Sequence, residues 1–241
     1  MKGGQSILSE MESEARRHDL TSPAFLVVAS VVSIAIWYVP YGWIALYPCR
    51  MFVTFIHEAG HAIAAIVTQG TVEEMIIHPD GSGETLTRGG LPFLIASAGY
   101  LTSAAYGAGL LALSRNGHRT RQVLTWNAGL ILAVTFFLTS NLFGWILGIG
   151  LSAGLIWLAI GVSERWAHFL LNLLAVQCCL NAFFDLRTLL WISQTTNLHS
   201  DAKLLETMTL LPASVWTIGW GTLSLCFWAA GLWNYARLGR Q

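Results

Sequence analysis

The chain alternates long apolar blocks with short polar stretches, and several blocks approach the roughly 20 residues that a helix needs to cross a hydrocarbon core. The predicted apolar helices cover, in chain order, 24–39, 51–68, 91–113, 123–139, 142–161, 167–191 and 212–235. Pro40 should kink or end the first helix, with YGWIALY completing it at the membrane interface. The pattern predicts an all-α polytopic membrane protein with about seven transmembrane helices. The alternative has about six, with the kinked first segment lying partly in the interface.

Residues 71–90 break this helical pattern. Two short β-prone pieces, 71–77 and 84–88, flank the sequence PDGSG, whose composition is typical of a hairpin turn. The sequence therefore predicts a small β-hairpin directly after the second apolar helix.

Composition supports a membrane protein and excludes some partners. The chain of 241 residues is 54% hydrophobic and 11% charged, with a mean hydropathy of +0.57, which is too apolar for an ordinary soluble domain. The formal net charge is zero and no basic cluster is present, so we expect a lipid bilayer and no nucleic acid as partner. Residues 1–22 form a polar tail, and 23–241 are predicted to be a single membrane domain. Neither the membrane orientation nor the oligomeric state follows from the sequence.

The candidate metal-binding and catalytic residues lie in the segment 55–67, FIHEAGHAIAAIV, inside the second apolar helix. His57 and His61 are one helical turn apart and share a face, and Glu58 follows the first of them, which is the HExxH arrangement of zinc hydrolases. Two histidines and one further ligand hold zinc with a position left for water, whose pKa falls toward about 7. We therefore expect about one zinc ion per chain, with Glu58 as the general base.

Two other interpretations of this motif remain open. The titratable side chains could form a satisfied polar pair between helices, or a proton relay in a transporter. Small residues around the motif favour a closely packed metal site instead, because they let helices approach each other: Ala59, Gly60, Ala62, Ala64 and Ala65.

A third ligand must come from elsewhere in the chain. Asp185 is the only acidic residue of the later spans in a strongly apolar context, where a carboxylate is costly unless it is paired. It is the predicted ligand, although a salt bridge to Arg187 or a position near water would also explain it. Asn181, one helical turn earlier, could orient Asp185 or hydrogen-bond a reacting carbonyl.

Asp201 is the alternative third ligand. Its loop-like surroundings, HSDAKLLE, fit better with an N-cap for the segment that follows. The other histidines lie in predicted loops or at span ends and are interpreted as solvated: His78, His118, His168 and His199.

Several features together resemble one family. They are HEAGH in a membrane span, the hairpin after it, SAGYLTSAAYG at 97–107, the late Asp185, and SDAKLLETMTLLPASVW. This set is similar to the site-2 protease family of intramembrane zinc metalloproteases, and most of all to its compact bacterial-type branch, over roughly residues 50 to 215. The chain departs from the family pattern at Leu186, where a glycine is usual.

The resemblance implies a function. His57, His61 and Asp185 would bind zinc, Glu58 would activate water, and the substrates would be transmembrane segments of other proteins in a bacterial-type cell membrane. The competing class is a non-enzymatic scaffold, binder or transporter that retains the motif. An intact Glu58 favours the enzyme, because a binder has no use for a general base. The hairpin is expected either to offer a strand edge to an extended substrate or to cap the helices.

Overall fold

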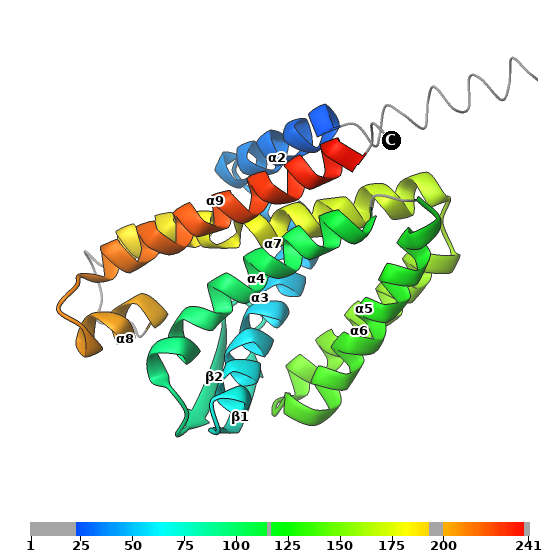
Figure 1. Ribbon diagram of the computed structural model, residues 1–241. Helices are drawn as coiled ribbons and strands as arrows, with labels where there is room; N and C mark the ends of the chain where they lie inside the picture. Colours follow the sequence, from blue (N-terminus) through cyan, green and yellow to red (C-terminus); the bar gives the residue numbers. More distant parts are fainter. Residues whose placement is uncertain (1–22, 115–116, 193–199, 239–241) are drawn as a thin grey trace, which may run out of the picture.

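Seven long helices, one short helix and one β-hairpin make up the part of the chain described by the computed structural model, residues 23–114, 117–192 and 200–238. The elements are α2 (Pro23–Tyr38), α3 (Gly42–Val67), β1 (Thr71–Ile77), β2 (Gly83–Arg88), α4 (Pro92–Ser114), α5 (Gly117–Leu138), α6 (Leu142–Ile160), α7 (Glu164–Ile192), α8 (Asp201–Met208) and α9 (Ala213–Leu238). Helix α4 lies at the centre and packs against α3, α7 and α9, whereas α5 and α6 form a pair at one side (Figure 1).

Four of the described helices are long and apolar enough to cross a membrane. They are α4, the Arg119–Leu138 part of α5, α6, and the Ala213–Arg237 part of α9. Large apolar side chains such as Trp126, Phe137 and Trp157 are exposed on them, as expected of surfaces that face lipid. A mostly helical membrane protein with a small hairpin is therefore confirmed, and the count of about seven spans stays a prediction.

The break at Pro40 differs from the prediction. Helix α2 ends at Tyr38, and α3 begins at Gly42, so the segment YGWIALY belongs almost wholly to the motif helix and not to the first span. Tyr41 takes a left-handed conformation with φ 64°, and the Gly42 N–H donates to the Val39 carbonyl. This turn separates α2 from α3, so assigning 41–47 to the first helix was wrong.

The hairpin forms where it was predicted and lies along α3. Strands β1 and β2 are antiparallel, from Thr71 opposite Arg88 to Ile77 opposite Gly83. The turn is held by α3, because Thr54 donates to the Gly81 carbonyl at 2.9 Å and the Tyr47 hydroxyl donates to the Pro79 carbonyl at 2.6 Å. Gly81 adopts φ +89°, a conformation that L side chains rarely adopt.

The outer edge of β1 is closed by the connection between α5 and α6. The Ser140 N–H donates to the Met75 carbonyl at 2.9 Å, and the Ser140 hydroxyl oxygen accepts from the Met75 N–H at 3.1 Å. The Asn141 side chain accepts from the Ile77 N–H at 3.2 Å and donates to the Ile77 carbonyl at 2.8 Å. The backbone groups of Met75 and Ile77 therefore point away from β2.

The outer edge of β2 is open as a consequence. In an antiparallel pair, residues opposite each other both point their backbone groups outward or both inward. Thr85 lies opposite Met75 and Gly83 lies opposite Ile77, so their N–H and C=O groups point to the far edge of β2. No third strand pairs with that edge within the described residues.

One histidine that was interpreted as solvated is buried. The His168 side chain is only 3% exposed and lies 3.1 Å from the Thr120 hydroxyl and 2.9 Å from the Tyr235 hydroxyl. The earlier interpretation was wrong because α5, α7 and α9 meet at this point and cover it. His78 is half-buried next to the hairpin turn, and the side chains of His118 and His199 lie outside the described residues.

Candidate metal centre

Helix α3 presents both motif histidines on one face. The Nε2 atoms of His57 and His61 are 3.0 Å apart, as the spacing of one helical turn predicts. The site is shielded from solvent, since His61 is 5% exposed and Glu58 is 4% exposed.

Helix α4 orients His61. The Nδ1 atom of His61 lies 2.6 Å from the carbonyl oxygen of Ile95, which can only accept a hydrogen bond. Nδ1 must therefore carry the proton, which leaves a lone pair on Nε2 of the neutral ring. Such a contact to the second ring nitrogen is typical of metal-ligating histidines.

The carboxylate of Asp201 completes the group. Its Oδ2 atom lies 3.2 Å from Nε2 of His57 and 3.3 Å from Nε2 of His61. A carboxylate oxygen at these distances from two ring nitrogens can share one metal ion with them.

Ser200, not Asp201, is the N-cap of α8. The Ser200 side chain accepts a hydrogen bond from the Lys203 N–H, and Asp201 is the first helical residue. The interpretation of Asp201 as the cap is therefore wrong, and its carboxylate is available to the histidines because Ser200 takes the capping role.

The predicted ligand Asp185 and its neighbour Asn181 belong to α7, but their side chains lie outside the described residues. Their predicted roles therefore stay predictions. The structure brings the alternative, Asp201, to the histidines.

The geometry of the three side chains fits a zinc ion. Tetrahedral zinc with bonds of about 2.0–2.1 Å separates its ligand atoms by about 3.3 Å. The three separations here are 3.0, 3.2 and 3.3 Å. Among the described residues, His57, His61 and Asp201 are the one group of metal-ligating side chains found this close together.

Helix α4 also supplies the space that the centre requires. A Cβ atom on Gly99 would lie 2.5 Å from Nε2 of His61 and would collide with Nε2 of His57, so only glycine fits here. The next residue, Tyr100, packs its ring edge-on against His57, with centroids 4.6 Å apart, and stacks on Trp220 of α9 at 4.8 Å. These rings form an apolar wall that strengthens electrostatic interactions inside the site.

Strand β2 holds the motif glutamate. The Thr85 hydroxyl donates to Oε2 of Glu58 at 2.7 Å. Gly83 lies close by, since a Cβ atom there would be 2.7 Å from Cγ of Glu58. Sequence reasoning missed both contacts, because it began the second strand at residue 84 and assigned Gly83 to the turn.

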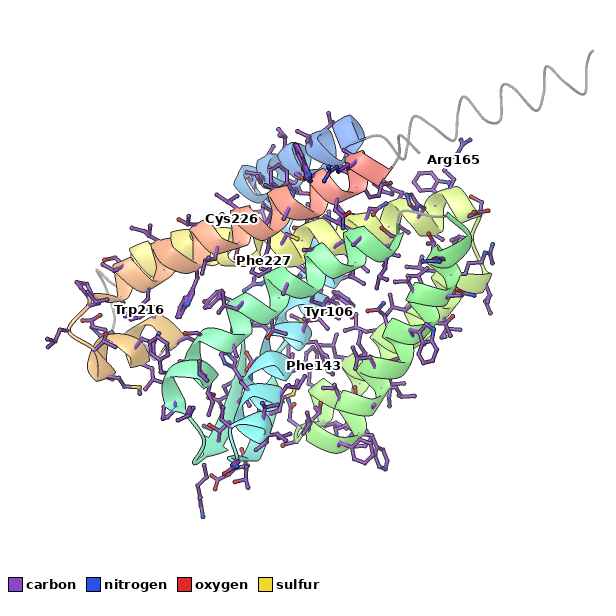
Figure 2. The ribbon with its side chains drawn as sticks, viewed as in Figure 1. Tyr106, Phe143, Arg165, Trp216, Cys226 and Phe227 are labelled. Atoms are coloured by element: carbon purple, nitrogen blue, oxygen red, sulfur yellow. The ribbon has the colours of Figure 1, made fainter. Side chains whose placement is uncertain are left out.

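The short helix that carries Asp201 is fixed to the start of α9. Oε2 of Glu206 accepts a hydrogen bond from the Ala213 N–H at 3.1 Å, and the Thr209 hydroxyl oxygen accepts one from Nε1 of Trp216 at 3.2 Å. Figure 2 shows Trp216 at the end of α9 nearest α8. These contacts attach α8, and hence Asp201, to α9.

Comparison with known proteins gives one match. The family model described as Peptidase M50B-like matches residues 26–231, which is most of the chain. No curated protein and no solved structure matches the chain.

Proposed function

The chain belongs to the Peptidase M50B-like family, and we propose that it is an intramembrane zinc metalloprotease that hydrolyses peptide bonds in or near transmembrane segments of other membrane proteins. One observation carries the proposal: two helical histidines and a distant aspartate converge at metal-ligand distances, with a buried glutamate beside the first histidine. That donor set, with an adjacent base, is the arrangement of hydrolytic zinc sites.

We assign His57, His61 and Asp201 as the ligands of about one zinc ion per chain. Zinc, when bound, supplies Lewis acidity that activates water and polarises a carbonyl group. Asp185 remains the competing third ligand from the sequence, and Asn181 remains a candidate hydrogen-bond donor to the reacting carbonyl.

Glu58 is the proposed general base and acid. Its carboxylate takes a proton from the attacking water and returns the proton to the amine nitrogen that leaves when the peptide bond breaks. The Tyr100 and Trp220 rings keep bulk water from the centre, so the proton moves between Glu58 and the reacting atoms.

Four helices are candidate spans by length and composition: α4, α5, α6 and α9. We propose that α2, α3 and α7 are spans as well, which would give about seven and a metal centre within the thickness of the bilayer. The expected location is a bacterial-type cell membrane, and the expected partners are a transmembrane protein substrate and the surrounding lipid.

A substrate helix must be stretched before its peptide bond can be cut, which leaves backbone groups without partners in a medium that lacks water. The open edge of β2 offers such partners, through the outward groups of Gly83 and Thr85. Strand β1 is unsuited because residues 139–141 already occupy its edge. We therefore propose that an extended substrate pairs with β2.

A proline at Thr87 tests this docking mode. By the same alternation, the Thr87 N–H points to the open edge, and proline removes that donor without touching a ligand. We expect Thr87→Pro to keep its zinc but lose about 10-fold or more of its cleavage rate, most strongly for substrates with stable helices. Thr87→Ala, which keeps the N–H, is the matched control. If both variants cleave equally well, the hairpin is a structural cap.

The proposed activity is tested with purified protein in liposomes and a panel of fusion proteins that each carry one transmembrane segment. We expect mass spectrometry to locate cuts in or near that segment, and we expect 1,10-phenanthroline to abolish and added zinc to restore them. A zinc-loaded protein that cuts no member of the panel would favour the alternative, a scaffold, binder or transporter.

A further inference from the structure

We propose that Thr85 is a positioning residue for Glu58. Through Thr85, the strand β2 that docks the substrate also holds the general base in place. The inference rests on the proposed function, because it assigns Thr85 a role in the same reaction. It adds a link between substrate binding and the geometry of catalysis.

The Thr85 side chain contacts Glu58. Its hydroxyl lies 2.7 Å from Oε2 of Glu58 and 3.2 Å from the main-chain oxygen of the same residue. A hydroxyl has one proton to donate, and the shorter distance assigns it to the carboxylate. Because Glu58 is only 4% exposed, this bond fixes the orientation of a carboxylate that solvent barely reaches.

Strand β2 also approaches Glu58 closely at Gly83. A Cβ atom on Gly83 would lie 2.8 Å from Oε1 and 2.9 Å from Cδ of Glu58. Positions 83 and 85 lie on the same face of the strand. The Glu58 side chain therefore packs against the backbone of Gly83 and accepts a hydrogen bond from the Thr85 hydroxyl. Any shift of β2 relative to α3 therefore moves the carboxylate or breaks its hydrogen bond.

The Thr85 backbone faces away from β1. Thr85 lies opposite Met75, whose own N–H and C=O groups are bound to Ser140 at the far edge of β1. The Thr85 N–H and C=O groups therefore point to the open edge of β2. Thr85 thus meets Glu58 with its side chain and an extended substrate with its backbone.

The link predicts a specific kinetic effect. Replacing Thr85 by valine removes the hydroxyl but keeps the shape and the backbone groups that pair with substrate. We expect Thr85→Val to lower kcat by about 10-fold or more, with KM changed less than about twofold, because docking is intact and the base is no longer held in place. Thr85→Ser, which keeps the hydroxyl, should restore kcat to within about threefold of the wild-type value.

Two controls separate this role from a structural one. Thr71→Val removes an exposed hydroxyl from β1, the strand of the same hairpin that does not dock the substrate, and should cleave like the wild-type protein. Zinc content should equal that of the wild-type protein in all three variants, because Thr85 and Thr71 are not among the proposed ligands. Loss of zinc in Thr85→Val, an unchanged kcat, a change confined to KM, or no rescue by serine would each overturn the proposal.

A readout that does not depend on activity distinguishes this inference from the proposed function. The infrared bands of the Glu58 carboxyl group can be identified in metal-free protein as the difference between the wild-type protein and Glu58→Gln. We expect Thr85→Val to shift these bands and Thr71→Val to leave them in place. A shifted band in a protein that cleaves nothing would confirm the contact while the protease proposal fails. Cleavage with a band that does not shift would overturn the role of Thr85 alone.

Discussion

Replacing Glu58 by glutamine is expected to lower the rate of cleavage by about 100-fold or more while the protein keeps its zinc. Glutamine preserves the size of the side chain but cannot take a proton from water. The Thr85 hydroxyl can still donate to the amide oxygen of glutamine, so the packing against β2 is retained. The measurement is kcat/KM on a transmembrane substrate, together with metal analysis of the same sample.

Glu74→Gln is the matched control for this prediction, because Glu74 is an exposed carboxylate on β1 of the same hairpin. It should cleave at the wild-type rate. Full activity of Glu58→Gln would mean that another group is the base. Loss of zinc together with activity would mean that Glu58 supports the metal centre instead of the reaction.

Replacing Gly99 by alanine is expected to empty the metal centre. The added methyl group would lie 2.5 Å from Nε2 of His61 and closer still to Nε2 of His57, so the imidazoles must turn away or α3 and α4 must separate. Overpacking of this kind costs about 1–3 kcal/mol in a folded core. Because both colliding atoms are proposed ligands, we expect zinc affinity to fall by about 100-fold or more, with loss of cleavage.

Gly109 provides the control on the same helix. A Cβ atom there would meet no atom within 4 Å, so Gly109→Ala changes the same residue type in α4 without filling the site. It should bind zinc and cleave like the wild-type protein. Normal zinc affinity in Gly99→Ala would show that α4 does not lie against the metal centre as described.

The HExxH helix and the hairpin could be predicted because both signals are local. One helical turn separates His57 from His61 in any α-helix, and the turn composition at 79–83 specifies a hairpin wherever it occurs. The break at Pro40 was also recognised, but the sequence could not show which helix the residues after it would join.

The position of Asp201 could not be predicted, because it depends on contacts between segments far apart in the chain. Burial in an apolar context pointed to Asp185, and Asp201 was assigned to the role that its neighbour Ser200 performs. A serine directly before the aspartate was a signal that another residue could cap the helix. Helix α8 packs against α4, because the buried side chains of Ala202 and Leu205 lie in one cluster with Ala96 and Tyr100, and no local pattern reveals that contact.

The contacts of the Thr85 and His168 side chains could not be predicted for a related reason. Thr85 sits in a strand of ordinary composition, and its contact with Glu58 exists only because β2 folds back along α3. His168 lies near the end of a predicted span, where solvent was expected, but three helices converge on it. In both cases tertiary packing decides what the side chain meets.

The zinc content of purified protein tests the central claim most directly, measured for the wild-type chain and for Asp201→Ala and Asp185→Ala. The account predicts about one zinc per chain in the wild-type protein, little or none in Asp201→Ala, and about one in Asp185→Ala, because Asp201 is the carboxylate beside both histidines. If Asp185→Ala loses zinc and Asp201→Ala keeps it, the third ligand is Asp185 and the protease proposal stands. A wild-type protein that binds no zinc, or one that binds zinc equally well without His57 and His61, would contradict the account.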